Sequence, residues 1–595
     1  MTNEELYNRM IHQDPEFNLL EEKWITVFSK EGELKKVSLV DVLLNGSKYE
    51  CLAGENELQN AALLRLLTAF SATFLLRWNE NGEKKDIENK NEALRRWEKA
   101  WIKKTFPEEA ITQYFKEFKD RFWLFHPEKP FFQSYSALDG TGYKNLKLVC
   151  SIMESNNSPS LFPTRKIINQ SFTKEEKLEI FKNPKTYTDC ELEYDEAARW
   201  LITYFYYSDG IKVTNKQGKY SSGSELPGKP MSTGWLGKLG LITAQGANLF
   251  ETILLNTVLL KDGKTKWEEA PFPLWEREEL VLELEQTLVP SNLPQLLTYP
   301  TRQLLLIRQE KTIVGFAAIS GETTNLINGF DEPFTLWKVD KKKNQFTPKK
   351  VDTSHELWGD FKYFFWDEEM KYRRPGIINW LSLLAKNQML SDAAIHLNYQ
   401  SVEYKKSEYS IKEINCNSLK ITMNLFSRLD DYADVIGKEV EKCIEASSKC
   451  LCYANQMKFI TGAISKLNDT SDSYPKRLCW GCLNQPFKDW LLNVDVSEID
   501  DEVQKWKNTA RKVLLQNVLH QLQHQYRPRN PSCRELKPDK KRKLYPEGKI
   551  FDSAFVEREF IRSINSLFSK KADGSNFGQS SQKGDEYDNR NQSSQ

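Results

Sequence analysis

The residues from Gly223 to Lys229 come closest to a known chemical motif. Gly223 is followed by four residues and then by Gly228 and Lys229, which satisfies most of the phosphate-loop pattern G-x-x-x-x-G-K-[ST]. The next residue, Pro230, supplies neither a hydroxyl group for Mg²⁺ nor a backbone N–H, and no apolar strand precedes Gly223. The pattern argues against nucleotide hydrolysis. It predicts a glycine-rich loop that suits a phosphate or a groove, with an ordinary surface loop as the alternative.

Two cysteines and two histidines have spacings found among metal ligands. Cys479 and Cys482 form a CxxC pair, and His520 and His524 would share one face of a helix. The gap between the pairs is far longer than in a zinc finger, and the histidines fit the polar face of an amphipathic helix equally well. We therefore predict structural roles and no cofactor, with a zinc site as the alternative.

No arrangement of residues predicts catalysis. The chain has only six histidines, no HExxH motif and no Ser, His and Asp near a strained turn, so we expect a protein that is not an enzyme. Folding can always bring two carboxylates together, so a metal-dependent nuclease stays an alternative. A purely structural scaffold is a second alternative.

The composition excludes few classes of protein, but the chain length and the net charge limit the domain organisation and the kind of nucleic-acid contact. A chain of 595 residues is too long for one core, and its net charge of +1 leaves nucleic-acid contacts to local patches. The first residues are polar, and no run of eighteen apolar residues occurs, so we expect a cytoplasmic protein without a membrane segment. The ten cysteines then indicate free thiols.

The hydrophobic pattern predicts an α+β protein. Residues 24–28 and 36–39 flank a polar turn at Gly32 and predict a hairpin followed by a short helix, and residues 57–78 predict a buried helix. The apolar segment behind the glycine loop, up to Leu260, also has helical spacing.

The second half of the chain has longer helical runs. They lie at 377–390, 419–467, 502–526 and 551–568 and predict an all-α four-helix bundle. The expected organisation is a large mixed α/β globular domain over residues 1–374, the bundle over 375–570, and a disordered polar tail over 571–595.

A collinear series of segments carries a family resemblance. It comprises FNLLEEKWITV from Phe17, VSLVDVL from Val37, LQNAALLRLL from Leu58, FHPEKPFFQ from Phe125, YDEAARWLI from Tyr194, GWLGKLG from Gly234 and QGANLFETILLN from Gln245. Together they resemble the CasA family, the large subunit of the type I-E CRISPR surveillance complex Cascade. The resemblance implies a non-enzymatic reader of a short protospacer-adjacent motif in double-stranded DNA. Such a subunit promotes strand separation and R-loop formation, and its implied partners are guide RNA, the other Cascade subunits and a recruited helicase–nuclease.

The resemblance also implies which residues contact nucleic acid. The motif loop corresponds to Leu226, Pro227, Gly228 and Lys229, where a single glycine flanked by Pro227 and Pro230 departs from the family pattern. A loop that meets the guide RNA and the motif corresponds to Asn156, Asn157 and Phe162. An ordinary loop is the alternative in each case.

Two further elements are implied with less definite residues. Pro333 occupies the expected lysine-finger position, which leaves as candidates Lys338, Lys341, Lys342 and Lys343. The wedge that splays the first base pair corresponds to a hairpin whose candidates are Gln400, Lys405, Lys406 and Ser407, with Gln400 reaching the tip only by a shifted register. For both elements, a plain hairpin turn is the alternative.

A basic block in the second half of the chain is the last candidate. We expect phosphate contacts, or else a solvated linker, from Lys540, Lys541, Arg542 and Lys543.

Overall fold

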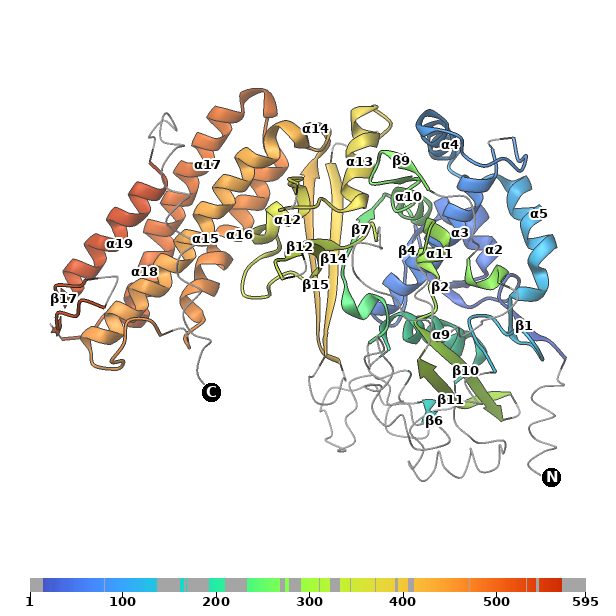
Figure 1. Cartoon of the computed structure of the whole chain (residues 1–595), viewed down its shortest axis with the longest axis horizontal. Coiled ribbons are helices and arrows are strands. Elements are labelled where there is room, and N and C mark those ends of the chain that lie inside the picture. The colour runs from blue at the N-terminus through green and yellow to red at the C-terminus, as the bar shows by residue number, and fades with distance from the viewer. Residues whose placement is uncertain are drawn as a thin grey trace. The chain divides into compact units, whose positions relative to one another are not determined.

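The protein folds into two compact units. The computed structural model describes residues 14–79, 81–135, 161–164, 167, 192–208, 233–267, 273–277, 290–309, 311–320, 332–342, 344–369, 371–390, 394–404, 411–469, 471–530, 532–541 and 545–569. Unit 1 contains the chain up to Val440 together with Lys488–Val496. Unit 2 contains Glu441–Phe487 and the chain from Ser497 onward (Figure 1). The predicted α+β class is confirmed, and the expected tail, 571–595, lies outside the described residues.

Unit 1 mixes helices with small antiparallel sheets. Its helices are α2 (Leu39–Asn45), α3 (Glu57–Arg77), α4 (Lys90–Lys103), α5 (Glu108–Phe118), α9 (Tyr194–Tyr207), α10 (Leu249–Leu255), α11 (Leu293–Leu297), α12 (Phe361–Phe365), α13 (Gly376–Lys386) and α14 (Met423–Ser427). The hairpin and short helix predicted near Gly32 are present. Gly32 has a φ of +80°, which favours glycine at this turn.

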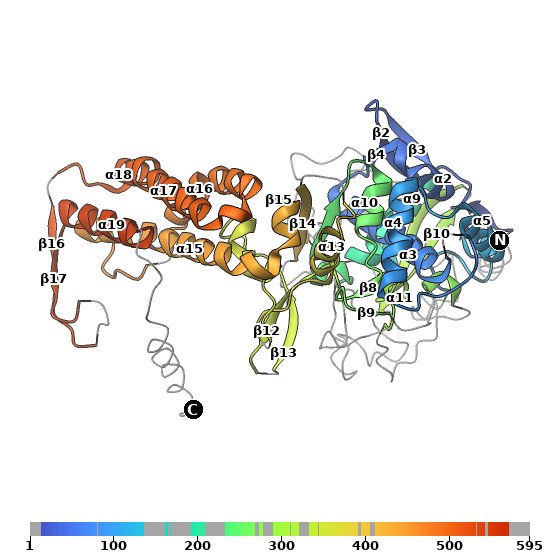
Figure 2. The ribbon, with the colours of Figure 1, turned by 90° about the horizontal axis from the view of Figure 1, so that it is seen from above.

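The described strands of unit 1 form three sheets of three strands and three pairs. The sheets are β3 (Leu34–Val37)–β2 (Ile25–Ser29)–β4 (Tyr49–Leu52), β10 (Arg302–Gln309)–β11 (Thr312–Ser320)–β6 (Leu161–Pro163) and β15 (Ile411–Thr422)–β14 (Ala394–Tyr404)–β7 (Gly240–Gln245). The pairs are β1 (Glu16–Asn18)–β5 (Trp123–Phe125), β8 (Leu260–Lys261)–β9 (Thr265–Lys266) and β12 (Leu336–Asp340)–β13 (Gln345–Lys349). Separate small sheets allow hairpins to extend beyond the core, as β12–β13 does in Figure 2.

Helix α3 is the central helix of unit 1. Its N-cap Asn56 accepts a hydrogen bond from the N–H of Gln59 at 2.9 Å, and its side chains are apolar around nearly the whole circumference. Among the described residues it is the one helix long and apolar enough to cross a membrane, yet 89% of its most apolar stretch is buried inside the protein. Its composition is therefore that of a core helix.

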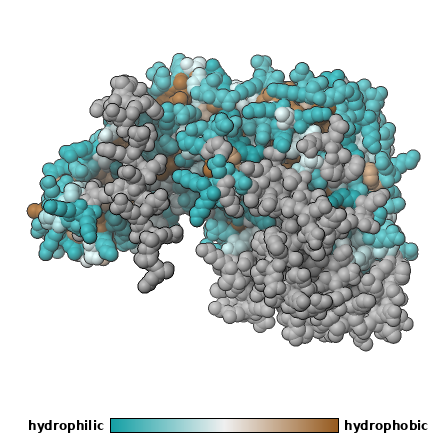
Figure 3. Space-filling model, in the orientation of Figure 1, coloured by the Kyte–Doolittle hydropathy of each residue, from teal (hydrophilic) through white to brown (hydrophobic). Residues whose placement is uncertain are grey.

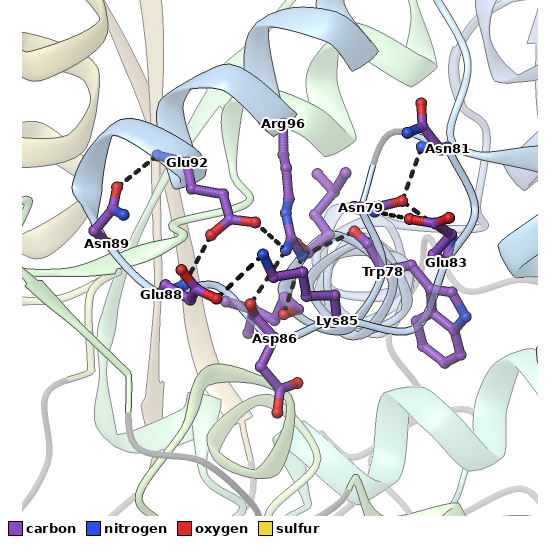
Figure 4. A network of polar contacts seen from close by, with 12 residues as sticks. Trp78, Asn79, Asn81, Glu83, Lys85, Asp86, Glu88, Asn89, Glu92 and Arg96 are labelled. Atoms are coloured by element: carbon purple, nitrogen blue, oxygen red, sulfur yellow. Dashed lines mark hydrogen bonds and ion pairs between the residues drawn. The ribbon is translucent and has the colours of Figure 1, made fainter.

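A buried arginine joins the end of α3 to α4. Arg96 on α4 donates to the carbonyls of Leu75 (3.1 Å), Trp78 (2.9 Å) and Asp86 (3.2 Å) and pairs with the Glu92 carboxylate at 2.5 Å (Figure 4). Carbonyls at a helix C-terminus lack hydrogen-bond donors within the helix, and the Arg96 guanidinium donates to them instead. The corner is thus fixed by one side chain.

Unit 2 consists mainly of helices. They are α15 (Leu429–Ile460) and α16 (Tyr474–Asn493), both of which begin or end in unit 1, followed by α17 (Ile499–Val513), a π-helical turn (Leu514–Val518), α18 (Leu519–Tyr526) and α19 (Ser553–Leu567). Aromatic contacts join them: Tyr453 lies 5.4 Å from Phe560, and Phe487 lies 5.1 Å from Trp506, between ring centroids. The predicted C-terminal helical region is confirmed, with a hairpin of β16 (Cys533–Leu536) and β17 (Lys549–Asp552) inserted before α19.

The helices of the bundle differ from those predicted. The run at 377–390 is α13 of unit 1, and the run at 419–467 begins inside strand β15. The domain boundary expected at residue 374 therefore lies within unit 1. Strand β14 follows residue 374 in the chain, and it pairs with β7 of the same unit. Helix α16 was not predicted, since Pro486 lies inside it and its apolar positions have a weak helical period.

The helix predicted to continue to Leu260 is also shorter than expected. It ends at Leu255, and the side chain of Asn256 then donates to the carbonyls of Ala244 and Thr252, both at 2.7 Å. An asparagine that satisfies nearby carbonyls in this way ends a helix and joins it to β7.

Substitution of Arg96 tests the α3–α4 corner. Arg96→Met should lower the free energy of unfolding by about 3–5 kcal/mol, because Glu92 would be left buried without its counter-charge. Arg95 is exposed on the same helix, so Arg95→Met should change stability by no more than about 0.5 kcal/mol. Urea unfolding followed by circular dichroism measures both. Equal stability of the two variants would contradict this assignment.

Candidate nucleic-acid interface

A buried ion pair lies at the centre of unit 1. Arg65 of α3 donates two hydrogen bonds to the carboxylate of Glu332, at 3.1 and 2.8 Å, and the two side chains are only 3% and 1% exposed. Arg65 also donates to the carbonyls of Leu296 and Leu297 at 3.3 Å. The Glu332 carboxylate accepts a further bond from the indole N–H of Trp235 at 2.8 Å. The pair thereby connects α3 to α11 and to Trp235. Because Glu332 lies four residues before β12, the pair also holds the segment that leads into the β12–β13 hairpin.

The two described ends of the glycine-loop region meet in space. The N–H of Gly234 donates to the carbonyl of Ser208 at 2.8 Å. A Cβ atom at Gly234 would lie 2.4 Å from the carbonyl oxygen of Tyr206, so this close approach requires glycine. Arg302 of β10 donates to the Ser208 hydroxyl at 2.8 Å. We call this meeting point the Ser208–Gly234 junction; the predicted motif-loop residues Leu226, Pro227, Gly228 and Lys229 lie between its ends, outside the described residues.

The β14–β15 hairpin contacts the same place. The hydroxyl of Tyr404, the last residue of β14, donates to the Tyr207 carbonyl at 2.9 Å. A Cβ atom at Gly237 would lie only 2.4 Å from the Tyr404 hydroxyl oxygen, so the strand end packs tightly on the turn that follows the junction. Tyr404 pairs with Ile411, and the wedge candidates Lys405, Lys406 and Ser407 lie between them, outside the described residues.

The register places Gln400 away from the hairpin tip. Gln400 lies opposite Cys416 of β15 and Leu241 of β7, in the middle strand of its sheet, and its side-chain nitrogen is buried without a hydrogen-bond partner. The shifted register that would bring Gln400 to the tip is therefore wrong, because β14 is paired on both sides.

Lys350 connects the β12–β13 hairpin to the same turn. It directly follows β13, and its ammonium group donates to the carbonyl of Gly237 at 2.7 Å and to that of Val402. Burial lowers the pKa of Lys350 to about 8, although the nearby Glu403 carboxylate opposes the shift. The ends of three chain segments thus meet around Gly237: the Ser208–Gly234 junction, the end of β14 and the end of β13.

The lysine-finger candidates lie on this hairpin. Lys338, Lys341 and Lys342 are exposed, and Lys343 is outside the described residues. The Asp340 carboxylate accepts a bond from the N–H of Lys342 at 3.0 Å and shapes the turn. The hairpin predicted as the alternative is present, and exposed lysines at its turn suit phosphate or base acceptors.

Phe162 lies in a strand rather than in a loop. It belongs to β6, at the edge of the β10–β11–β6 sheet, and its register partner is Phe316 of β11. Asn156 and Asn157 lie outside the described residues. In Figure 1 the β14–β15 pair extends toward the side of unit 1 on which β6, β10 and β11 lie.

The basic block of unit 2 is only partly described. Lys540 and Lys541 are exposed, and the N–H of Lys541 donates to Asp539 at 3.0 Å, whereas Arg542 and Lys543 lie outside the described residues. On the face drawn in Figure 3 the described surface is mainly hydrophilic. Exposed lysines such as Lys540 and Lys541 suit contacts with phosphates.

The four residues of the zinc hypothesis occupy different environments. Cys479 is fully buried in α16, where it interacts with the buried thiol of Cys450, while Cys482 is half-buried. His520 and His524 are exposed on α18. The described residues contain no group of three or more His, Cys, Asp or Glu side chains able to hold a metal ion.

Sequence reasoning missed the residues that hold the junction in place. Arg65, Glu332, Tyr404 and Lys350 were not singled out, although Arg65 is the one charged residue inside the apolar run of α3. A lone charge in an apolar helix indicates a buried partner, but the pattern does not show which residue it is.

Comparison with known proteins identifies the family. The family model described as "CRISPR-associated protein Cse1" matches residues 18–517, most of the chain. The chain belongs to the Cse1 family. A Cse1-family relative, "CRISPR-associated protein CasA/Cse1" of Thermus thermophilus, is 28% identical over 348 residues, which are 58% of this chain and 59% of that relative. The alignment thus spans about three-fifths of the relative's length.

Solved structures of the Cse1 family share the fold. Thermobifida fusca Cse1 has a TM-score of 0.71 at 21% identity, over 93% of this chain and 98% of that one. A chain from a structure titled "CRISPR RNA-guided surveillance complex" has a TM-score of 0.62 at 15% identity, over 93% of this chain and 100% of that one. At these identities the likeness establishes the fold.

Substitution of Glu332 tests the buried pair. Glu332→Gln keeps the size of the side chain but leaves Arg65 buried without a counter-charge, so we expect a loss of about 3–5 kcal/mol in the free energy of unfolding. Glu368 is exposed and pairs with Lys371, and Glu368→Gln should be near-neutral. Chemical unfolding compares the two, and a near-neutral Glu332→Gln would show that the pair is not needed for stability.

Proposed function

We propose that this chain is the large subunit of an RNA-guided type I-E CRISPR surveillance complex. In that role it recognises a protospacer-adjacent motif in foreign double-stranded DNA, promotes strand separation and R-loop formation, and recruits a helicase–nuclease. Its partners are then guide RNA, the other Cascade subunits and the target duplex. Support comes from membership of the Cse1 family and from the shared fold of a chain in a CRISPR RNA-guided surveillance complex.

The observation that carries the proposal is the meeting of three chain segments around Gly237. The Ser208–Gly234 junction, Tyr404 and Lys350 are linked there by hydrogen bonds of 2.7–2.9 Å. These segments lead into the regions that resemble the motif loop, the wedge and the lysine finger. A reader that recognises a few base pairs and opens the next one needs these elements within a few nucleotides of each other.

Each element then has a distinct task. The segment with Gly228 approaches the groove of the motif, while Lys338, Lys341, Lys342 and Lys343 supply positive donors to bases or phosphates. The tip with Lys405 and Lys406 separates the first base pair. In unit 2 the block from Lys540 to Lys543 contacts phosphates without reading sequence. We propose that the chain acts by binding and leaves DNA cleavage to the recruited nuclease.

The motif preference of the assembled complex tests this function. Wild-type complex should select a short motif from a randomised duplex library in a mobility-shift assay. Metal-dependent cutting of plasmid DNA by the purified chain alone would instead support the nuclease alternative. Binding without motif preference would support the scaffold alternative.

A pair of hairpin variants sharpens the test. Lys341→Gln with Lys342→Gln should cost about 1–3 kcal/mol of binding free energy on the preferred motif, if these lysines reach bases or nearby phosphates. The matched control is Lys30→Gln with Lys35→Gln near the exposed β2–β3 turn, which should bind like wild type. Wild-type affinity and selectivity in the first pair would exclude this hairpin from the interface.

A further inference from the structure

The segment that directly follows β13 joins the β12–β13 hairpin to strand β14. The ammonium group of Lys350 donates to the carbonyl of Val402, and the N–H of Val351 donates to the hydroxyl of Tyr399 at 2.7 Å. Val402 is fully buried and Tyr399 is 3% exposed. Because water does not compete for buried acceptors, these two consecutive residues fix the exit of the hairpin on β14.

Lys350 also bridges two segments at the point where their strand pairing ends. The pairing of β14 with β7 runs as far as Ser401 opposite Gly240. Val402 is the next residue of β14, and Gly237 lies three residues before Gly240. Lys350 donates to the carbonyls of both Val402 and Gly237, at 2.7 Å in the case of Gly237. One ammonium group therefore extends the link between these segments beyond the last strand pair.

The entry of the β12–β13 hairpin is held on β7. Leu241 of β7 forms an isolated bridge with Thr335, which precedes β12, and the N–H of Ile242 donates to the carbonyl of Phe334 at 2.8 Å. The base of this hairpin is thus attached to β7 at its entry and to β14 at its exit. Strand β14 is also one arm of the β14–β15 hairpin, so the two hairpins share a base in one sheet.

We propose that Lys350 is a positioning residue that couples motif reading by the β12–β13 hairpin to duplex opening at the tip of the β14–β15 hairpin. The inference rests on the proposed function, in which Lys341 and Lys342 contact the motif and Lys405 and Lys406 separate the first base pair. While Lys350 keeps its two bonds, the bases of the hairpins do not shift relative to each other. The bonds therefore set the offset between the motif and the base pair that opens.

A fixed offset matters because opening a duplex costs free energy. Contacts with the motif can contribute to this cost only if the part of the protein that meets the base stack does not yield. Without the Lys350 bonds, the β12–β13 hairpin holds the motif while the β14–β15 tip gives way. Loss of Lys350 should therefore slow opening while leaving motif binding intact.

Two variants and a control measure the effect on opening. Lys350→Met keeps the apolar stem and removes the donors, Tyr399→Phe removes only the acceptor of Val351, and Lys103→Met changes an exposed lysine of α4. In the assembled complex, Lys350→Met should open a fully paired linear duplex about tenfold more slowly, as expected for a lost hydrogen bond from a charged donor. Tyr399→Phe should slow opening less, and Lys103→Met should match wild type. Fluorescence of 2-aminopurine in the first base pair beside the motif reports the rate.

Motif affinity is measured separately from opening. A duplex with mismatches directly beside the motif needs no opening, and on it both variants should bind within about twofold of wild type. Mismatches should also restore most of the opening rate. Thermal unfolding of the free chain and size-exclusion chromatography of the complex establish folding and assembly. A merely structural role would lower motif affinity and opening rate together.

The outcomes separate the coupling from the function on which it rests. Opening at the wild-type rate by an assembled Lys350→Met complex would overturn the coupling, and so would an equal loss of motif affinity and opening rate. If Lys350→Met does not assemble, Tyr399→Phe decides by the same two measurements. Failure of the wild-type complex to prefer a motif or to open the duplex would instead overturn the proposed function itself.

Discussion

The Arg65–Glu332 pair is the interaction on which the arrangement of unit 1 depends. A buried charge is costly unless it is paired and hydrogen-bonded, and here each member has several partners. Because Glu332 also binds Trp235, the segments before β12 and after the Ser208–Gly234 junction are held by one carboxylate. Charge pairing in the core thus sets the positions of segments that lead to the surface.

Glycine and tyrosine complete this arrangement by close packing. Gly234 and Gly237 leave room for the Tyr206 carbonyl and the Tyr404 hydroxyl, at separations that no side chain would permit. The three-stranded β7–β14–β15 sheet then fixes the hairpin, since β14 is hydrogen-bonded along both edges. The wedge that we propose at the tip of this hairpin would need such a rigid support against a base stack.

Local patterns in the sequence predicted local elements well. The Gly32 hairpin, α3 and the last helix of unit 2 follow from turn chemistry and apolar spacing. The spacing of apolar residues did not show that α13 belongs to unit 1. The chain around α13 is held in unit 1 by the pairing of β14 with β7, two strands that are far apart in the sequence. Arg65 and Glu332 are 267 residues apart, and no period in the sequence connects them. The collinear resemblance indicated the family, whereas individual contact residues such as Lys405 and Gly228 stay predictions.

The most direct test of the account is whether the buried pair is needed for motif reading. The double substitution Arg65→Met and Glu332→Met removes both charges together, so it should cost less stability than loss of either alone. It also removes the carboxylate that accepts from the indole of Trp235, the residue that follows Gly234 of the junction. We predict that the assembled complex carrying both substitutions still binds a pre-melted, single-stranded target but no longer selects the motif from a duplex library. A stably folded double variant that selects the motif as wild type does would contradict the account.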